Sequence, residues 1–501
     1  MPKLSAISDS DHEESDLLLN DSSDLKQFPG KARLWTVTYV CVVAVHAVIL
    51  SGFSLGFTSP VLSKLKDKDT VGYRSLRRIA FQDAFNITIL AGAMITAPFG
   101  GWLFDYFGRK LSIILCSIPY TIGWLLIILT VATDGPVFRP LLFTGRFVLG
   151  IGVGWTSVSG GLYPAEISPR HLRGSFVVMN QLALTSGTFL GQIIGVYISY
   201  VWLALIPLAF TVMFVSLATT IKETPRWLMT QGRKYEAKNV LLWLRGYQYD
   251  VDQELQEVEN RILSQKKLTL SEIFKEFKTK SVYYPVVLAC GIMFFRQFSG
   301  AFAILFNAED IFKQAEIKSP GLTSSLATGG VQIIASVVGV FIADLLGRRK
   351  LLMISGVVMC LSHAAMGTYE FLNNKPYCHP PDDPKCKDHL YPLAIVSIAC
   401  YIATYTAGWG AIARLLLPEL IPLRVRGVGI GVSFFVSWCS TIVVAGLFDN
   451  YEGAVKPWGA FWTLSLICLC SVIFVAMFIP ETKGRSLEEI ERSFRERRHT
   501  L

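Results

Sequence analysis

The sequence predicts an all-α polytopic membrane protein with twelve transmembrane helices in two six-helix bundles. Three observations lead to this prediction. The first is composition: 52% of the 501 residues are hydrophobic and only 17% are charged, whereas a soluble chain carries about 25% charge. The second is a series of twelve long apolar runs, and the third is an internal repeat. This composition excludes a soluble enzyme, a nucleic-acid-binding protein and a disordered scaffold.

Each apolar run is bounded by charged residues or by Pro and Gly, and about 20 helical residues suffice to cross a hydrocarbon core of about 30 Å. The predicted spans are residues 35–57, 82–104, 111–132, 138–160, 176–198, 201–220, 283–306, 324–346, 350–371, 391–416, 428–449 and 458–479. They divide the chain into a disordered acidic tail, an N-terminal bundle, a bridge of short amphipathic helices, a C-terminal bundle and a basic tail. These parts are residues 1–32, 33–221, 222–281, 282–480 and 481–501.

Lys and Arg in the short loops set the expected orientation, because cytosolic loops carry an excess of basic residues. The basic loop residues and the bridge fall on one face of the predicted membrane domain. An even number of spans places both termini on that face, which we assign to the cytosol. The segment 61–80 is an exception, since it carries six basic residues and lies on the opposite face.

The two predicted bundles repeat each other. An Asp-x-x-Gly-Arg motif, a Glu-x-x-Pro motif followed by Arg-Gly, and a Glu-Thr motif occur after spans 2, 4 and 6 and again after spans 8, 10 and 12. Paired Glu and Arg side chains there would form a cytosolic gate that closes between the bundles; alternatively, they only cap helices and fix topology. The predicted gate residues are Asp105, Arg109, Glu166, Arg173, Glu223, Asp344, Arg348, Glu419, Arg426 and Glu481.

Parallel repeats of six helices are the architecture of major-facilitator transporters, whose substrate site lies between the bundles near the bilayer midplane. Over about residues 33–490 the chain resembles the sugar-porter family of facilitative glucose transporters, and especially its intracellular class III branch. The residues that carry the resemblance are 145–152, 164–166, 181–183, 223–228 and 480–488, with Gln332 and the N-terminal leucines pointing to class III. The resemblance implies alternating-access movement of a small polar solute, by default a hexose, without a covalent step.

The resemblance also implies a solute site, only part of which this sequence retains. Positions that match the family's solute contacts are Gln181, Gln297, Gln332 and Trp438. Positions that depart from its pattern are Arg296, Phe302, Thr406, Arg414 and Ser437. Two prolines expected in span 10 are Ala411 and Ala413, so we expect this helix to be stiffer than in the family, because a helix without Pro keeps its hydrogen-bond ladder.

Arg296 and Arg414 leave the substrate open. An Arg at mid-membrane depth costs about 2.5–3.5 kcal/mol on insertion scales, so it normally faces a cavity or a partner. One interpretation is recognition of an organic anion such as a sugar acid, a sugar phosphate or a urate-like molecule, because Arg binds carboxylate and phosphate bidentately. The other is internal pairing with carboxylates such as Asp83, Glu309 or Asp310. A function of another class, a non-transporting solute sensor, also stays open.

Two smaller signals lie outside the spans. Glu14 precedes Leu18 and Leu19 in an acidic dileucine pattern, which predicts binding to clathrin adaptors and residence in an endosomal or lysosomal membrane, with the plasma membrane as the alternative. Cys378 and Cys386 lie in a predicted lumenal loop, where an oxidising compartment favours a disulfide. Besides the solute, membrane lipid and the clathrin adaptors, we expect no cofactor, no metal and no nucleic acid.

Overall fold

The computed structural model describes residues 34–67, 79–133, 137–168, 173–246, 251–263, 272, 275–301, 304, 320–373, 390–422 and 425–483. Helices coincide with all twelve predicted spans. Among the described residues, ten helices are both long and apolar enough to cross a membrane. The all-α fold predicted from the apolar runs is therefore confirmed.

The N-terminal bundle consists of α2 (Leu34–Gly56), α4 (Ile79–Phe107), α5 (Arg109–Leu115), α6 (Ser117–Leu129), α7 (Phe138–Ile167), α8 (Arg173–Tyr197) and α9 (Tyr200–Thr220), with the short α3 (Thr58–Asp67) after α2. The bridge contains α10 (Pro225–Thr230), α11 (Lys234–Arg245) and α12 (Val251–Leu263). The C-terminal bundle consists of α14 (Lys280–Phe298), α16 (Pro320–Leu346), α17 (Arg348–Asn373), α18 (Tyr391–Tyr405), η5 (Thr406–Gly410), α19 (Ala411–Leu420), α20 (Arg426–Val455) and α21 (Pro457–Phe478).

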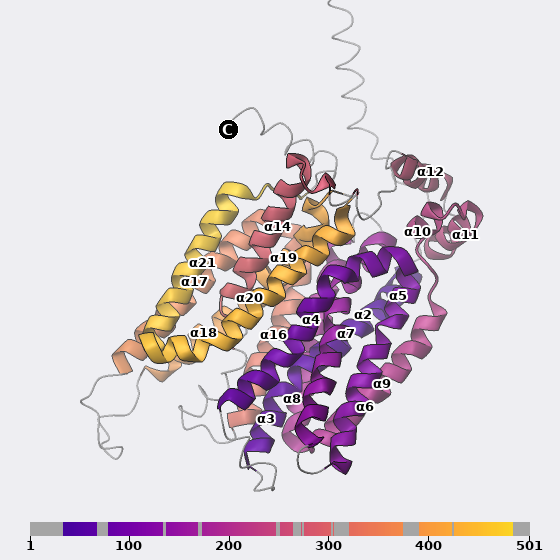
Figure 1. The fold of residues 1–501 in the computed structure, drawn as a ribbon. Coiled ribbons are helices and arrows are strands. Elements are labelled where there is room, and N and C mark those ends of the chain that lie inside the picture. Colours follow the sequence, from indigo (N-terminus) through magenta and orange to yellow (C-terminus); the bar gives the residue numbers. More distant parts are fainter. Residues whose placement is uncertain are drawn as a thin grey trace, which may run out of the picture.

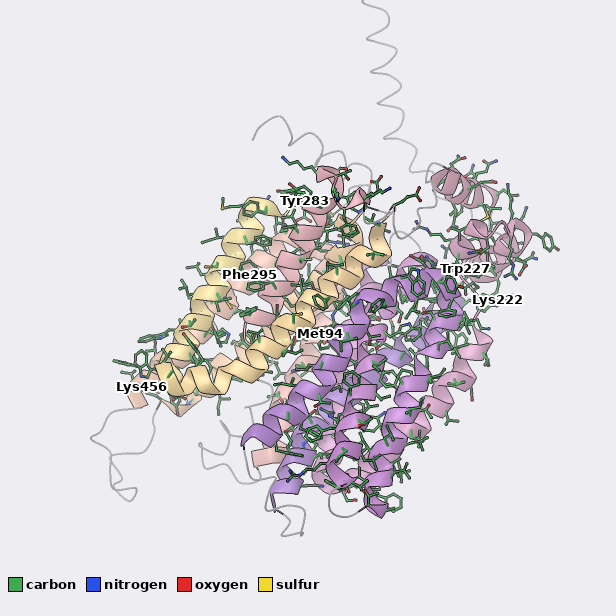
Figure 2. The ribbon with its side chains drawn as sticks, in the orientation of Figure 1. Met94, Lys222, Trp227, Tyr283, Phe295 and Lys456 are labelled. Atoms are coloured by element: carbon green, nitrogen blue, oxygen red, sulfur yellow. The ribbon has the colours of Figure 1, made fainter. Side chains whose placement is uncertain are left out.

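The two bundles lie side by side, and the bridge helices α10–α12 lie at one end of them, which we call the bridge end (Figure 1). Lys222, Trp227 and Tyr283 lie near this end, whereas Lys456 lies at the opposite end (Figure 2). Trp227 belongs to α10, the first bridge helix.

Helices α4 and α20 make the closest contact between the bundles. A Cβ atom added at Gly101 of α4 would overlap the carbonyl oxygen of Gly427 at the start of α20. One at Gly431 would lie 2.8 Å from the carbonyl oxygen of Ala97. Small residues let membrane helices approach this closely. The bundles are therefore in backbone contact toward the bridge end.

Helices α8 and α16 form the second contact between the bundles. The hydroxyls of Thr185 and Ser336 lie 3.2 Å apart across it. A Cβ atom at Gly329 would overlap the ring of Phe189. In the internal repeat α4 corresponds to α16 and α8 to α20. The two contacts are thus related by the same repeat that relates the bundles.

Two spans are not continuous α-helices. The third breaks at Cys116, where α5 ends and α6 begins. Pro119 has no N–H to donate to the carbonyl of Leu115, which accounts for the break. Span 10 contains a π-helical turn, Thr406–Gly410. Our expectation of a stiffer span 10 does not match this turn, because a π-turn interrupts the regular α-helical ladder without Pro.

The bridge packs against the N-terminal bundle. The side chain of Arg245 on α11 is 5% exposed. Its Nη1 donates to the carbonyl of Ile167 at the end of α7 over 3.0 Å, and its Nη2 lies 2.8 Å from Glu254 of α12. One buried guanidinium thus ties α11 and α12 to the end of α7.

Candidate functional site

A cavity lies between the two bundles, with about 80 Å³ of space for the centres of water-sized molecules. Helices α2, α7 and α8 line it from the N-terminal bundle, and α14, α19 and α20 line it from the C-terminal bundle. The polar side chains of the lining are Ser51, Thr156, Ser157, Asn180, Arg296, Gln297, Arg414, Ser437 and Trp438. A mainly apolar cavity with a few converging polar groups is the ordinary form of a small-molecule site.

Gln297 and Trp438 present polar atoms in this lining. The Gln297 amide nitrogen donates to the hydroxyl of Thr441 over 2.6 Å, which fixes the amide plane. The Gln297 Oε1 and the Trp438 Nε1 are buried and have no hydrogen-bond partner among the described residues. One acceptor and one donor, beside an aromatic face, match a sugar ring with its hydroxyls.

Arg296 and Arg414 line the same cavity. Arg296 is 5% exposed, and its guanidinium carbon lies 5.8 Å from the ring centre of Tyr405. Within the part of the chain that the structure describes, no hydrogen bond or ion pair reaches either guanidinium. The side chain of Asp83 and residues 309 and 310, which we had considered as partners, lie outside the described part.

The structure brings together five of the nine residues predicted for the solute site: Arg296, Gln297, Arg414, Ser437 and Trp438. Gln181, Gln332 and Thr406 are also buried, but they are not part of the cavity lining. Gln181 lies beside Gly410, at the end of the π-turn. Phe302 lies outside the described residues.

Sequence reasoning missed a buried hydroxyl cluster at the N-terminal side of the cavity. The hydroxyl of Ser51 lies 2.6 Å from that of Tyr120 and 2.5 Å from that of Thr156, which joins α2, α6 and α7. Ser51 and Thr156 both line the cavity. The sequence signal for this cluster was individual Ser and Thr residues within apolar spans. That signal is weak, because most such hydroxyls donate to the backbone of their own helix.

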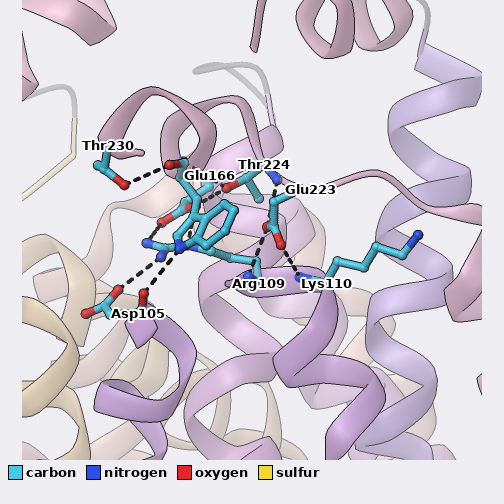
Figure 3. Close-up of polar contacts among 8 residues, drawn as sticks. Asp105, Arg109, Lys110, Glu166, Glu223, Thr224 and Thr230 are labelled. Atoms are coloured by element: carbon cyan, nitrogen blue, oxygen red, sulfur yellow. Dashed lines mark hydrogen bonds and ion pairs between the residues drawn. The ribbon is translucent and has the colours of Figure 1, made fainter. Parts of the chain in front are cut away.

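The gate residues of the N-terminal bundle form one network (Figure 3). Arg109 bonds both carboxylate oxygens of Glu166, at 2.9 and 2.7 Å, and lies 3.1 Å from Asp105. The hydroxyl of Thr224 donates to Glu166 over 2.8 Å. Glu223 accepts the backbone N–H of Arg109 over 2.9 Å. Burial raises the pKa of the Glu223 carboxyl, and the N–H groups that it accepts oppose this shift.

The C-terminal bundle repeats this network. Arg348 lies 3.5 Å from Glu419, which accepts the hydroxyl of Thr482 over 2.6 Å. Glu481 accepts the backbone N–H groups of Arg348 and Arg349 over 2.9 and 3.2 Å. The sequence repeat therefore encodes three matching contacts in each bundle: an Arg–Glu pair, a Thr hydroxyl that donates to that Glu, and a second Glu that accepts backbone N–H groups.

These contacts differ from the cross-bundle gate that we expected. The pairs Arg109–Glu166 and Arg348–Glu419 each join helices of a single bundle. Arg426 donates to the carbonyl of Ile421 in its own bundle, at 3.4 Å.

Some predictions fall outside the described part of the chain. These are the side chains of Arg173 and Asp344, the dileucine residues Glu14, Leu18 and Leu19, and the pair Cys378 and Cys386. The eight cysteines in the described part are free thiols.

Comparison with known proteins identifies the family. The profile described as sugar (and other) transporter matches residues 40–494. Mouse solute carrier family 2, facilitated glucose transporter member 8, is 32% identical over 88% of this chain and 91% of its own. The facilitated trehalose transporter Tret1 of the honeybee Apis mellifera ligustica is 29% identical over 96% of this chain and 92% of its own.

Solved structures show the same fold. The proton:xylose symporter XylE bound to 6-bromo-6-deoxy-D-glucose superposes with a TM-score of 0.77 at 22% identity, covering 91% of this chain and 99% of that one. The inward-open form of XylE from E. coli superposes with a TM-score of 0.69 at 21% identity, over 91% and 99% of the two chains. The architecture is therefore the major-facilitator fold, and the chain belongs to the sugar (and other) transporter family.

Proposed function

We propose that this protein is a facilitative transporter of a sugar or a sugar-derived solute, and not an enzyme. The observation that carries the proposal is a mainly apolar cavity with converging polar groups, placed between two repeated bundles of a sugar-transporter fold. Relatives named as facilitated glucose and trehalose transporters support the solute class. The bundles, residues 33–221 and 282–480, would rock about the cavity so that it opens to each side of the membrane in turn.

In this proposal the cavity holds the solute through groups of both bundles. The Gln297 Oε1 would accept a sugar hydroxyl, and the Trp438 ring would cover the apolar face of the sugar. Gln181, Gln332 and Thr406 would act only if a rearrangement of α8, α16 or η5 brings them to the cavity. Residues 105–109 and 344–348, with their glutamate partners, would form the two halves of the gate at the bridge end, one network in each bundle.

The test is sugar counterflow in proteoliposomes, with D-glucose and trehalose as solutes. We expect saturable exchange by the wild-type protein. We expect Trp438→Ala to lower the apparent affinity for the sugar about tenfold, a loss of about 1.4 kcal/mol of binding free energy. Trp438→Phe is the matched control, because it keeps an aromatic face while losing the indole N–H and one of the two fused rings. Equal losses in the two variants would contradict the stacking role.

The same assay separates a transporter from a sensor. A sensor would bind sugar and give no exchange at any solute gradient. Binding without counterflow in the wild-type protein would therefore overturn the transport proposal.

We further propose that the bridge end faces the cytosol and that the protein resides in an endosomal or lysosomal membrane. Arg109 and Lys110 contact Glu223, which precedes the first bridge helix, so these two basic residues lie at the bridge end, as expected for a cytosolic face. Glu14, Leu18 and Leu19 would bind clathrin adaptors, and Cys378 and Cys386 would form a lumenal disulfide.

Replacement of Leu18 and Leu19 by Ala tests this location. We expect a fluorescently tagged variant to move from internal membranes to the plasma membrane, as measured by surface labelling of intact cells. Replacement of Leu4 and Leu25 by Ala, outside the dileucine pattern, is the control. An unchanged distribution of the first variant would contradict the sorting role.

A further inference from the structure

Two guanidinium groups share the cavity without an acidic partner among the described residues. The Nε atoms of Arg296 and Arg414 are both buried and lack a hydrogen-bond partner within that part of the chain. Both positively charged side chains line the same cavity. The ring of Tyr405 faces Arg296 but cannot neutralise it. A pair of buried like charges is unfavourable unless something of opposite charge joins it.

Other buried arginines of this chain have hydrogen-bond partners that account for their burial. Arg146 is fully buried, and it donates to the carbonyl of Ser54 over 2.8 Å and to the hydroxyl of Thr58 over 2.6 Å. Its guanidinium carbon also lies 4.4 Å from the ring centre of Phe85. Arg109 is paired with a glutamate through two hydrogen bonds. Neither Arg296 nor Arg414 has a side-chain hydrogen bond or an ion pair within the described part of the chain, and unlike Arg146 they line the cavity between the bundles.

The C-terminal side of the cavity is also rich in donors. Four buried polar atoms of lining residues on α14, α19 and α20 have no hydrogen-bond partner among the described residues. Three of these atoms are donors and one is an acceptor. The donors are the Nε atoms of Arg296 and Arg414 and the Nε1 of Trp438, and the acceptor is the Oε1 of Gln297. A neutral sugar hydroxyl donates as well as accepts, whereas an oxyanion only accepts. The excess of donors and of positive charge therefore fits an anionic group better than a neutral one.

We propose that the solute carries an oxyanion, a carboxylate or a phosphate on a hydroxylated carbon frame, and that Arg296 and Arg414 bind it. This inference rests on the proposed function, because it takes the cavity to be the site of the transported solute. A guanidinium binds either oxyanion through two parallel hydrogen bonds. The frame's hydroxyls would bond Gln297, and its apolar face would lie against Trp438.

The experiment is solute binding to the purified full-length protein in detergent, measured by calorimetry. The three probes are D-glucose, D-glucuronate and D-glucose 6-phosphate, which share one ring and differ at carbon 6. We expect at least one anion to bind about tenfold or more tightly than glucose. Which anion binds more tightly distinguishes a carboxylate from a phosphate solute.

The variants test the two arginines. We expect Arg296→Gln and Arg414→Gln each to lower the ratio of anion affinity to glucose affinity about ten- to hundredfold. Arg414→Lys keeps the charge and loses only the forked geometry, so it should lose less of that ratio than Arg414→Gln. The melting temperature of each variant shows whether it is folded. An equal loss for all three probes would overturn the inference, as would a wild-type protein that binds both anions no better than glucose.

Counterflow of the same protein, reconstituted into proteoliposomes, keeps the two proposals apart. Glucose counterflow without anion preference overturns the oxyanion proposal and leaves the transporter proposal standing. Anion binding that depends on both arginines, without counterflow of any probe, supports the oxyanion site and overturns transport.

Discussion

At the scale of single residues, the buried pair of Arg109 and Glu166 shows how a sequence motif becomes a structural contact. Both side chains are mostly buried, at 11% and 9% exposure. Each oxygen of the glutamate accepts from the guanidinium, and Thr224 donates to it as well. Losing one partner of such a pair leaves an uncompensated buried charge, which typically costs about 3–5 kcal/mol.

We therefore expect Glu166→Ala to lower the apparent melting temperature in detergent by about 5 °C or more. The matched control is Glu236→Ala. Glu236 also pairs with an arginine, Arg233, over 2.6 Å, but both side chains are about half exposed, and exposed pairs contribute little. Similar shifts for the two variants would show that burial does not set the strength of the Arg109 pair.

The cavity lining contains some of the residues predicted for the solute site and not others, because the rotation of a helix decides which side chains face the cavity. Arg296 and Gln297 are adjacent in α14, and the structure places both at the cavity. Gln181 and Gln332 were assigned by resemblance alone, and the structure buries both away from the lining. A rotation of α8 or α16 by a fraction of a turn changes which side chain faces the cavity, and a single sequence does not specify that rotation.

At the scale of elements, glycines decide how closely helices and side chains approach. Gly108 and Gly347 have φ angles of +91° and +85°, a conformation that side chains disfavour. A Cβ atom at either position would also lie within 2.8 Å of a glutamate oxygen, of Glu223 or Glu481. The structure shows that they turn the chain between helices and admit a carboxylate to the backbone N–H groups.

The α4–α20 contact yields a test. Gly101→Ala places a methyl group against the backbone of Gly427, so we expect the bundles to separate at the bridge end and the rate of sugar counterflow to fall about tenfold or more, corresponding to at least 1.4 kcal/mol. Gly330→Ala is the control, since a Cβ there meets no atom within 4 Å. Unchanged counterflow in Gly101→Ala would show that the cycle does not require this contact.

The π-turn of span 10 illustrates what a search for proline misses. We expected a break in this helix only where a Pro removes a backbone hydrogen bond. The structure instead has a π-turn without Pro, Thr406–Gly410, which contains Gly408 and Gly410. Trp409 within the turn donates its indole N–H to the carbonyl of Leu352 over 3.1 Å. Such turns depend on tertiary contacts like this one, so the local sequence alone does not predict them.

At the scale of the whole molecule, the order and number of helices followed from the sequence because apolar length is a strong signal. The repeat of three motifs added the two-bundle arrangement. What the sequence did not supply was the pairing of charges within each bundle, since a repeat shows that two networks are equivalent without showing whether their members pair inside or between the copies.

Contacts between the bundles, not the covalent bridge, should hold the halves together. A break in the chain within residues 264–271 separates α10–α12, which Arg245 ties to the N-terminal bundle, from the C-terminal bundle. We expect the two fragments, expressed together, to co-purify and to support sugar counterflow. A break that leaves the fragments unable to co-purify would show that the α4–α20 and α8–α16 contacts are insufficient.

The pairing of Arg109 with Glu166 inside one bundle also bears on how the molecule changes shape. In the proposed rocking movement both charges would stay within one bundle, so opening the bridge end would not separate them and would need no electrostatic work on that pair. The barrier to opening would then arise from wetting of the glycine-lined backbone contact between α4 and α20. A barrier of this origin depends little on ionic strength, because dissolved salt screens charges and has little effect on close van der Waals contact.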